Sequence, residues 1–303
     1  MNEARSIEGA GNRKSVTGSV PQRRRRYHLT DIGLRAGAVI LLLAGVVVIL
    51  MPLIWMFSTS LKSDAQIFSN PPQWVPQPFV LSHFQHVFEQ APMFLWTRNT
   101  VFITLTTLVG ATFSSSIVGY GFACLRARGR STMFYLMLST IMLPGIVVLL
   151  PQFILFSYIG WIDTFYPLIV PTFFGIPFYI FLFRQFFLAL PRELVDAARI
   201  DGAGYLTVWW RIFVPLAIPA HVTVATFQFI AAWNDFLAPY VYLTSSDHMT
   251  LSLGTQYFLG LHGAQWGELM AMSVIMMIPM IIAFAFGQQY FVRGISTTGF
   301  GGR

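Results

Sequence analysis

Six long apolar segments, separated by short polar connections, dominate the sequence. They cover roughly residues 33–60, 99–124, 132–158, 164–188, 214–243 and 268–292. Each is long enough to cross a bilayer, because about 30 Å of hydrocarbon takes roughly 20 predominantly apolar residues in a helix. The pattern therefore predicts an all-α membrane protein with six transmembrane helices, in which residues 31–303 form one transmembrane domain.

The composition agrees with this pattern. The 303 residues are 55% hydrophobic and only 10% charged, whereas soluble domains carry about 25% charged residues. The single cysteine, Cys124, excludes an intrachain disulfide and gives no indication of a zinc or iron–sulfur site. We interpret Cys124 as a small packing residue.

The charge of +7 is unevenly placed along the chain. Every lysine and arginine except Lys62 and Arg98 lies in one of four places. These are the N-terminal part up to Arg35, the segment Arg126–Arg130, the segment Arg184–Arg211 and the C-terminal end. With six spans, these positions share one side of the membrane. Positive charge is retained on the cytoplasmic side, so we expect both termini to be cytoplasmic.

Residues 1–30 are polar and basic, and we expect them to form a disordered cytoplasmic tail. The run Arg23–Arg26 could contact nucleic acid. Its position beside the first span favours an orientation signal that also attracts anionic lipid. We therefore expect the lipid bilayer, and no nucleic acid, as its partner.

The second span is polar for a membrane helix. It contains Thr100, Thr104, Thr106, Thr107, Gly110, Ala111, Ser114, Ser115, Ser116, Gly119 and Gly121. Small and hydroxyl-bearing residues let helices approach closely and form hydrogen bonds across interfaces. We expect this helix to face protein or a cavity, with packing and substrate-lining roles both open.

The first connection, about residues 62–97, is rich in proline, which predicts extended segments rather than a helix. His83 and His86 are three residues apart, a spacing that could place two metal ligands on one helical face. Nothing close in sequence supplies a third ligand, so we interpret both as ordinary loop histidines and predict no metal site.

A compact charged segment, residues 191–204, interrupts the apolar pattern between the fourth and fifth spans. Pro191 suits the first position of a helix, and Glu193 and Asp196 follow in its first turns, where carboxylates are favoured. Leu194, Ala197, Ala198 and Asp201 would lie on adjacent faces, and the two alanines offer little side-chain bulk. Gly202 can adopt the left-handed conformation that ends a helix.

A second, amphipathic helix is predicted to begin near Tyr205 and to contain Leu206, Trp209, Trp210 and Phe213. The two helices form a helix–turn–helix element that we call the elbow (residues 191–215). A polar element of this kind between membrane spans indicates a docking site for a soluble partner.

The elbow resembles the "EAA loop" of permease subunits in binding-protein-dependent ABC importers. The matching residues are Glu193, Asp196, Ala197, Ala198, Gly202, Ile212, Val214 and Pro215. Asp196 stands where that family usually has Glu, and Val214 where it usually has Leu. Asp196–Ala203, Trp233–Leu237 with Pro239, and Tyr290–Gly294 are similar to the carbohydrate-uptake branch, in particular to the shorter permease of maltose-type systems.

The resemblance implies a bacterial or archaeal plasma-membrane importer that takes up a sugar, expected to be a di- or oligosaccharide, by alternating access. Its partners would be a second homologous permease, two ATP-binding subunits and an extracytoplasmic sugar-binding protein. The coupling residues would be Glu193, Asp196, Ala197, Ala198, Asp201 and Gly202. The chain would be non-catalytic, with no cofactor of its own. It lacks a phosphate-binding loop motif, so ATP and Mg²⁺ would be bound by the partner ATPase.

The candidate substrate pathway is Trp233, Asn234 and Asp235, near the end of the fifth span. An ionisable residue at membrane depth is costly and usually functional, although Asp235 could instead satisfy backbone groups at a helix break. The connection of about residues 244–267 could contact a binding protein or the sugar.

Two other classes of membrane protein are alternatives to the importer. An ion-coupled secondary transporter or channel would also have polar spans, but Asp235 is its only clear intramembrane carboxylate. A membrane hydrolase would need a nucleophile with a base, or a metal cluster, and His221 is isolated in sequence. Neither class accounts for the elbow.

Overall fold

The computed structural model describes residues 29–191, 193–260 and 263–298, with side chains over 34–191, 193–260 and 263–289. Within these ranges the chain is helical and contains no strand, which confirms the predicted all-α class. The predicted disordered tail falls almost entirely outside the described residues, since α1 begins at Leu29. The terminal segment Gly299–Arg303 also lies outside them.

The α-helices in the described part of the chain are α1 (Leu29–Thr59), α2 (Asp64–Ile67), α3 (Ser82–Gln90), α4 (Met93–Cys124), α5 (Arg130–Ser139), α6 (Gly145–Tyr158), α7 (Tyr166–Ile169), α8 (Pro177–Leu188), α9 (Glu193–Ile200), α10 (Tyr205–Val208), α11 (Val214–Leu216), α12 (Ile218–Asn234), α13 (Leu237–Tyr242), α14 (Leu251–Gly254) and α15 (Trp266–Thr298). Short 3₁₀ segments are η1 (Thr140–Met142), η2 (Val170–Phe174), η4 (Ser246–His248) and η5 (Thr255–Leu259), and η3 (Trp209–Phe213) is a π-helical segment.

The chain divides into two units, residues 1–51 and Pro52–Arg303. The described part of the first unit belongs to α1, whose stretch Leu34–Thr59 has a mean hydropathy of 2.9. Such a stretch is long and apolar enough to cross a membrane.

The second unit is built around α4, which packs against α8, α12 and η2, while α12 in turn packs against α15. The buried face of α4 carries the small and hydroxyl-bearing residues noted in the sequence. Gly110 lies against the Phe173 ring and Gly119 against Phe183. This confirms that the second predicted span faces protein, because only residues without bulk allow such close helix approach.

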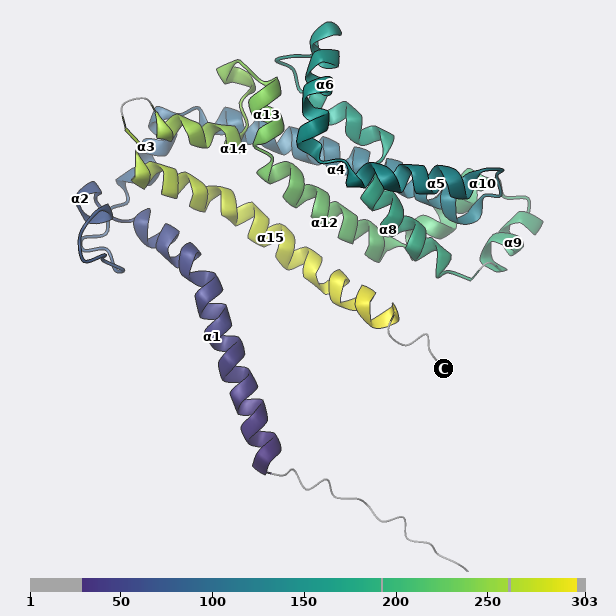
Figure 1. Cartoon of the computed structure of the whole chain (residues 1–303), viewed down its shortest axis with the longest axis horizontal. Helices are drawn as coiled ribbons and strands as arrows, with labels where there is room; N and C mark the ends of the chain where they lie inside the picture. Colours follow the sequence, from purple (N-terminus) through teal and green to yellow (C-terminus); the bar gives the residue numbers. More distant parts are fainter. Residues whose placement is uncertain (1–28, 192, 261–262, 299–303) are drawn as a thin grey trace, which may run out of the picture. The chain divides into compact units, whose positions relative to one another are not determined.

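Each end of this unit has its own apolar core. Figure 1 shows α9 and α10 at one end, and α2, α3 and α14 at the other. We call these the α9 end and the α3 end. Near the α9 end, Tyr120, Phe183, Phe187 and Phe213 form an aromatic core. Near the α3 end, a second core is formed by Val87, Trp96, Trp233, Phe258 and Met272.

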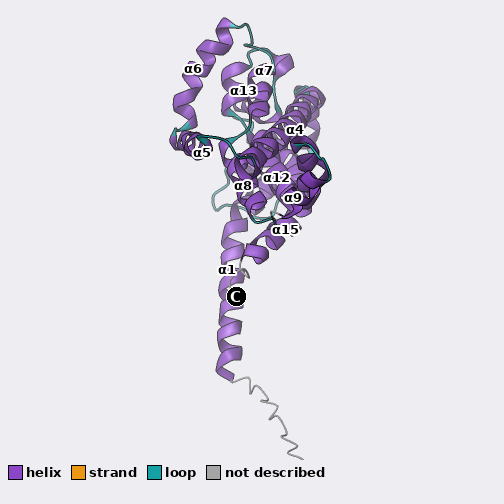
Figure 2. Ribbon diagram, turned by 90° about the vertical axis from the view of Figure 1, so that its right-hand side faces the viewer, coloured by secondary structure: helices purple, strands orange, loops and turns teal. Residues whose placement is uncertain are grey.

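The third predicted span is not a single helix. Residues Arg130–Met142 and Gly145–Tyr158 meet at an angle of 99°, and Figure 2 shows α5 and α6 pointing in different directions. Pro144 is the reason, since a residue before proline is restricted to extended backbone. Leu143 accordingly has ψ 120° and ends η1.

The fifth predicted span is also interrupted. Residues Tyr205–Leu216 and Ile218–Asn234 are bent by 81° about Ala217. The helix then ends at Asn234 and resumes as α13, so residues 214–243 are not one continuous span. Four described helices can span a membrane by themselves, and the number reaches six if each bent pair counts as one span.

The first connection differs from the sequence prediction as well. Its proline-rich part, residues 70–80, forms no helix, as expected, but α3 forms after it and carries both His83 and His86. These histidines are therefore helical rather than loop residues.

Candidate functional site

The first limb of the elbow is α9, which begins at Glu193 and places Glu193 and Asp196 in its first turn and Arg199 in its last. This order of charges complements the helix dipole. Residue 192 lies outside the described part of the chain, so the helix is described only from Glu193, two residues after Pro191.

The turn after α9 has the hydrogen bonds of a Schellman motif. Ala203 N–H donates to Ala198 O at 2.9 Å and Gly202 N–H donates to Arg199 O at 3.1 Å. Gly202 has φ +80°, the left-handed conformation that this motif requires at its last-but-one position. The predicted role of Gly202 in the turn is confirmed by this geometry.

The six predicted coupling residues do not share one surface. Glu193, Asp196, Ala197, Asp201 and Gly202 are exposed, but Ala198 is buried. Ala198 belongs to the aromatic core near the α9 end. Ala197 is therefore the alanine that gives the exposed face of α9 little side-chain bulk. Ala198 packs α9 against the aromatic core.

The second limb begins near Tyr205, as predicted, and is anchored to α4. Trp209 Nε1 donates to Ser116 Oγ at 3.2 Å, and His221 Nε2 lies 3.0 Å from the same hydroxyl. Val208 and Phe213 are buried. The second limb of the elbow is thus joined to α4 and α12 through packed aromatic rings and a shared hydroxyl group.

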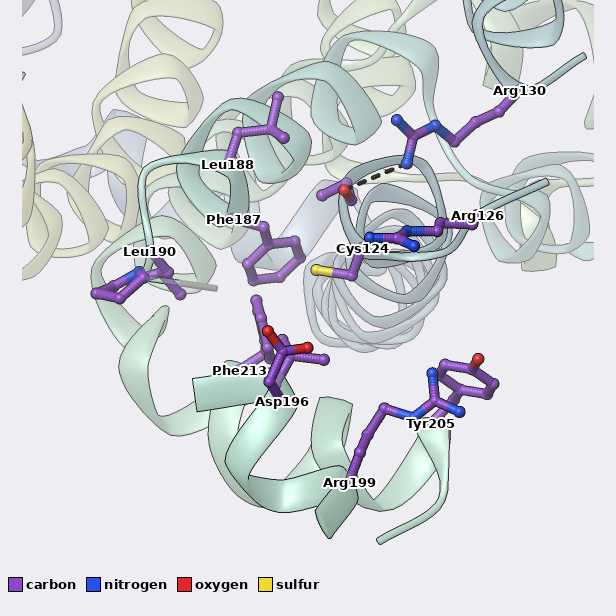
Figure 3. Close-up of a pocket in the computed structure, with 13 residues that line it drawn as sticks. Cys124, Arg126, Arg130, Phe187, Leu188, Leu190, Asp196, Arg199, Tyr205 and Phe213 are labelled. Atoms are coloured by element: carbon purple, nitrogen blue, oxygen red, sulfur yellow. Dashed lines mark hydrogen bonds between the residues drawn. The ribbon is translucent and has the colours of Figure 1, made fainter. Parts of the chain in front are cut away.

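A cavity of about 310 Å³ lies between the first limb and the ends of α4 and α8. Figure 3 shows Asp196 extending from α9 toward Phe187 and Cys124, with Arg126 and Arg130 on the opposite wall. The charged groups have local roles: Arg130 Nη1 donates to Leu125 O at 2.7 Å, and the Arg199 guanidinium lies 4.6 Å from the centre of the Tyr205 ring. The cavity separates the first limb from α4, which leaves α9 presented at the surface.

A second cavity, of about 160 Å³, lies between α4 and α12 and has several polar walls. Its lining includes Thr100, Thr107, Thr172, Gln228, Asp235 and Thr250. Hydroxyl, amide and carboxylate groups of this kind can exchange hydrogen bonds with a polar ligand.

Only one of the three predicted pathway residues lines this cavity. Asp235 does so, while its Oδ1 also accepts a hydrogen bond from Ala238 N at the start of α13. Trp233 is buried and donates to Met276 O at 3.0 Å, and Asn234 is exposed and donates to Ile230 O at 2.9 Å. Trp233 therefore links α12 to α15 and Asn234 bonds within α12, and neither lines the cavity.

Gln228 was missed by sequence reasoning, although a signal for it exists. It lies seven residues before Asp235, with Ala231 and Ala232 between them on the same helical face. All four residues line the cavity. A polar residue in an apolar span, in register with a carboxylate, indicates a shared polar surface.

Metal-ligating side chains gather at the α3 end. His83 and His86 lie one turn apart on α3, and the fold brings Glu268 of α15 to within 3.1 Å of both. The third potential ligand, which the sequence did not place near the histidines, is thus supplied by a helix 182 residues further along the chain.

Comparisons with known proteins agree with this architecture. The family described as "Binding-protein-dependent transport system inner membrane component" matches residues 115–297, more than half of the chain and the whole elbow. The arabinooligosaccharides transport system permease protein AraQ of Halalkalibacterium halodurans is 34% identical over 251 residues, 82% of this chain and 90% of the relative.

Two further similarities extend over most of the chain. The sn-glycerol-3-phosphate transport system permease protein UgpE of Yersinia pestis is 30% identical over 264 residues, 84% of this chain and 94% of the relative. A crystal structure of a bacterial ABC transporter involved in the import of the acidic polysaccharide alginate contains a chain with the same fold. Its TM-score is 0.77 at 23% identity, and the match covers 88% of this chain and 99% of the other. The chain belongs to the family of inner membrane components of binding-protein-dependent transport systems.

Proposed function

We propose that the chain is the permease subunit of an ATP-driven importer that takes up a sugar, most simply a di- or oligosaccharide, by alternating access. Family membership and the names of relatives that serve arabinooligosaccharides and sn-glycerol-3-phosphate support a carbohydrate substrate. The relatives are transport permeases rather than enzymes, in agreement with a non-catalytic role.

The observation that carries the proposal is the geometry of the elbow. Its first limb presents exposed Glu193 and Ala197, while exposed Asp196 is directed toward the cavity and Ala198 packs in the aromatic core. Such an element can seat in the cleft of a soluble partner and transmit that partner's movement as a rigid body. In this proposal α9 is the coupling helix of the importer.

The partners follow from that arrangement. Two ATP-binding subunits would bind ATP and Mg²⁺, one of them receiving α9, and a second homologous permease would complete the pathway. An extracytoplasmic sugar-binding protein would deliver the substrate to the α3 end. Six spans with both termini cytoplasmic would place the elbow and the arginines Arg126, Arg128 and Arg130 on the cytoplasmic side.

The cavity lined by Gln228 and Asp235 supports a polar substrate. Sugar hydroxyl groups donate and accept hydrogen bonds, and the threonine, amide and carboxylate groups of this cavity offer both partners. A volume of about 160 Å³ is small for an oligosaccharide, so this chain would contribute one wall of a pathway shared with the second permease.

The alternative of an ion-coupled secondary transporter or channel rests on Asp235. That carboxylate accepts a hydrogen bond from Ala238 N, a structural role at the start of α13. Family membership favours an importer that depends on a binding protein over an ion-coupled protein.

A pull-down of the chain from its native membrane in mild detergent tests the proposal. An ATPase and a second permease should be recovered with the wild-type chain. The variant Ala197→Arg should lose the ATPase, because it places a long charged side chain on the exposed face of α9 without entering the core. We expect at least a tenfold loss of recovered ATPase, equivalent to about 1.4 kcal/mol of docking free energy.

Thr207→Arg is the matched control, since Thr207 is exposed on α10 outside the first limb. It should retain the ATPase. Recovery of the wild-type chain alone, or equal recovery of the ATPase with Ala197→Arg, would contradict the proposed coupling role.

A further inference from the structure

Three potential metal ligands converge at the α3 end. His83 Nδ1 and His86 Nδ1 each lie 3.1 Å from Glu268 Oε1. All three ligand atoms lie within 4.8 Å of one another. The two histidines come from α3 and the carboxylate from the first turn of α15, so the cluster joins two elements that are remote in sequence.

The cluster has a closed inner side and an open outer side. His83 is 5% exposed and Glu268 is 8% exposed. The His86 side chain is 43% exposed. A charged or strongly polar group that is buried normally requires a compensating partner, and solvent can still reach the cluster past His86.

The tautomer of His83 is fixed by its second nitrogen. His83 Nε2 lies 2.7 Å from Lys62 O, and a carbonyl can only accept, so Nε2 carries the hydrogen. In the neutral ring, Nδ1 then presents a lone pair to the Glu268 carboxylate. His83 Nδ1 is buried and has no hydrogen-bond partner among the described residues. Two acceptors at 3.1 Å repel each other unless a proton or a metal cation lies between them.

The two distances to Glu268 Oε1 are close to those in zinc sites. A tetrahedral ion with bonds of about 2.0–2.2 Å holds its ligand atoms roughly 3.3 Å apart, close to the separations at Glu268 Oε1. Ligating histidines usually donate their other N–H to a carbonyl or carboxylate, as His83 does to Lys62 O. Imidazole nitrogens favour zinc and related metals, whereas Ca²⁺ and Mg²⁺ favour oxygen ligands.

Gly267 leaves the space that the His83 ring occupies in the cluster. A Cβ at this position would lie 2.3 Å from the nearest atom of the His83 ring. The absence of a side chain at residue 267 therefore lets the ring reach the carboxylate of the next residue.

We propose that His83, His86 and Glu268 bind a divalent transition metal ion of the zinc class, which fastens α3 to the start of α15. Three protein ligands leave a fourth position, on the accessible side of His86, for water or for a ligand from another molecule. The site is independent of the elbow and of the transported substrate.

Titration of the purified chain with Co²⁺ and Zn²⁺ tests this site. The chain should be in detergent or nanodiscs, freed of metal with a chelator, and without a histidine tag. We expect one equivalent of Co²⁺ to give the visible absorption of a tetrahedral complex and Zn²⁺ to displace it. Zn²⁺ should also raise the melting temperature of the chain, because a ligand that binds only the folded state stabilises it.

His86→Ala and Glu268→Gln should each abolish the Co²⁺ spectrum and the thermal shift. His248→Ala is the matched control, because His248 Nδ1 also lies beside a carboxylate, 3.3 Å from Asp163 Oδ1, but without a third ligand. It should behave as the wild type.

Absence of stoichiometric binding by the wild type would overturn the proposal. Unchanged binding by His86→Ala, or an equal loss in His248→Ala, would also overturn it. If Glu268→Gln does not fold, His86→Ala decides the question, since its half-exposed side chain can be removed without opening the core. None of these measurements depends on transport.

Discussion

At the scale of single residues, backbone conformation decides what the elbow tolerates. Gly202 and Gly204 are two residues apart, and an added Cβ at either would meet no atom within 4 Å. They differ in backbone: Gly202 has φ +80°, whereas Gly204 has φ −72°. Side chains other than glycine cost roughly 1–2 kcal/mol in the left-handed region, so only Gly202 is required by its conformation.

We predict that Gly202→Val uncouples ATP hydrolysis from transport while the spans still insert. The strain of about 1–2 kcal/mol disfavours the turn that orients α9, which corresponds to about a 5- to 30-fold loss of transport. The measurement is ATPase activity stimulated by the loaded binding protein, together with uptake into vesicles. Gly204→Val should keep both activities, and normal stimulated ATPase activity in Gly202→Val would refute the prediction.

At the scale of elements, the close contact of α4 with α8 depends on one glycine. A Cβ on Gly119 would lie 2.7 Å from Phe183 Cβ and 3.1 Å from Ile180 O, whereas a Cβ on Gly121 would meet nothing within 4 Å. Neither backbone nor a packed Cβ can move aside at low cost.

We predict that Gly119→Ala lowers the free energy of unfolding by about 1–3 kcal/mol, the usual cost of overpacking. Thermal melting of the detergent-purified chain measures it. Gly121→Ala on the same helix is the control and should melt as the wild type does. Equal melting of the two variants would show that α8 separates from α4 more easily than the contacts indicate.

Asp163 links two connections between elements, the loop between α6 and α7 and the loop after α13. Its Oδ1 accepts hydrogen bonds from Thr244 N and Ser245 N at 2.9 Å and from Ser245 Oγ at 3.0 Å. Burial would raise the pKa of Asp163, but these hydrogen bonds hold that pKa well below its ordinary value. A depressed carboxyl pKa stabilises the fold above the unfolded pKa of about 3.9 and stops doing so as the pH falls through the folded value.

We predict that Asp163→Asn destabilises the chain by about 1–2 kcal/mol at neutral pH, because a charged acceptor is replaced by a neutral one. Asparagine accepts the φ of +61° found at this position, so backbone strain does not contribute. Melting should show a difference from the wild type that is constant from pH 7 to about pH 4 and shrinks below it. Asp247→Asn, at an exposed carboxylate nearby, should show no such difference.

At the scale of the whole molecule, the two bends decide how the chain crosses the membrane. If each bent pair forms one span, the chain crosses six times and its positively charged connections share the cytoplasmic side. If either pair is a re-entrant loop, the connections that follow it change sides.

Cysteine labelling in sealed vesicles checks this topology. In a Cys124→Ala background, Ser246→Cys should react with a membrane-impermeant reagent from the extracytoplasmic side, and Arg128→Cys only from the cytoplasmic side. Both positions are exposed. Labelling of the two positions from one side would exclude the six-span arrangement.

Much of the fold could be predicted from the sequence, because membrane spans are set by local hydropathy and length. The turn at Gly202 and the second helix near Tyr205 were also predicted, since helix ends depend on nearby residues. The break at Pro144 was not predicted: the third span was expected to be one helix, and a bend of 99° depends on what the two helix pieces pack against.

The sequence by itself determined the helical membrane class, the elbow and the similarity to binding-protein-dependent permeases, because each depends on residues that are neighbours in the chain. Only the tertiary structure decided that Ala198 packs inward while Ala197 stays exposed, and that Asp235 shares a cavity with Gln228. It alone brought Glu268 to His83 and His86. These outcomes depend on which helix faces lie against each other, and residues far apart in the chain settle that together.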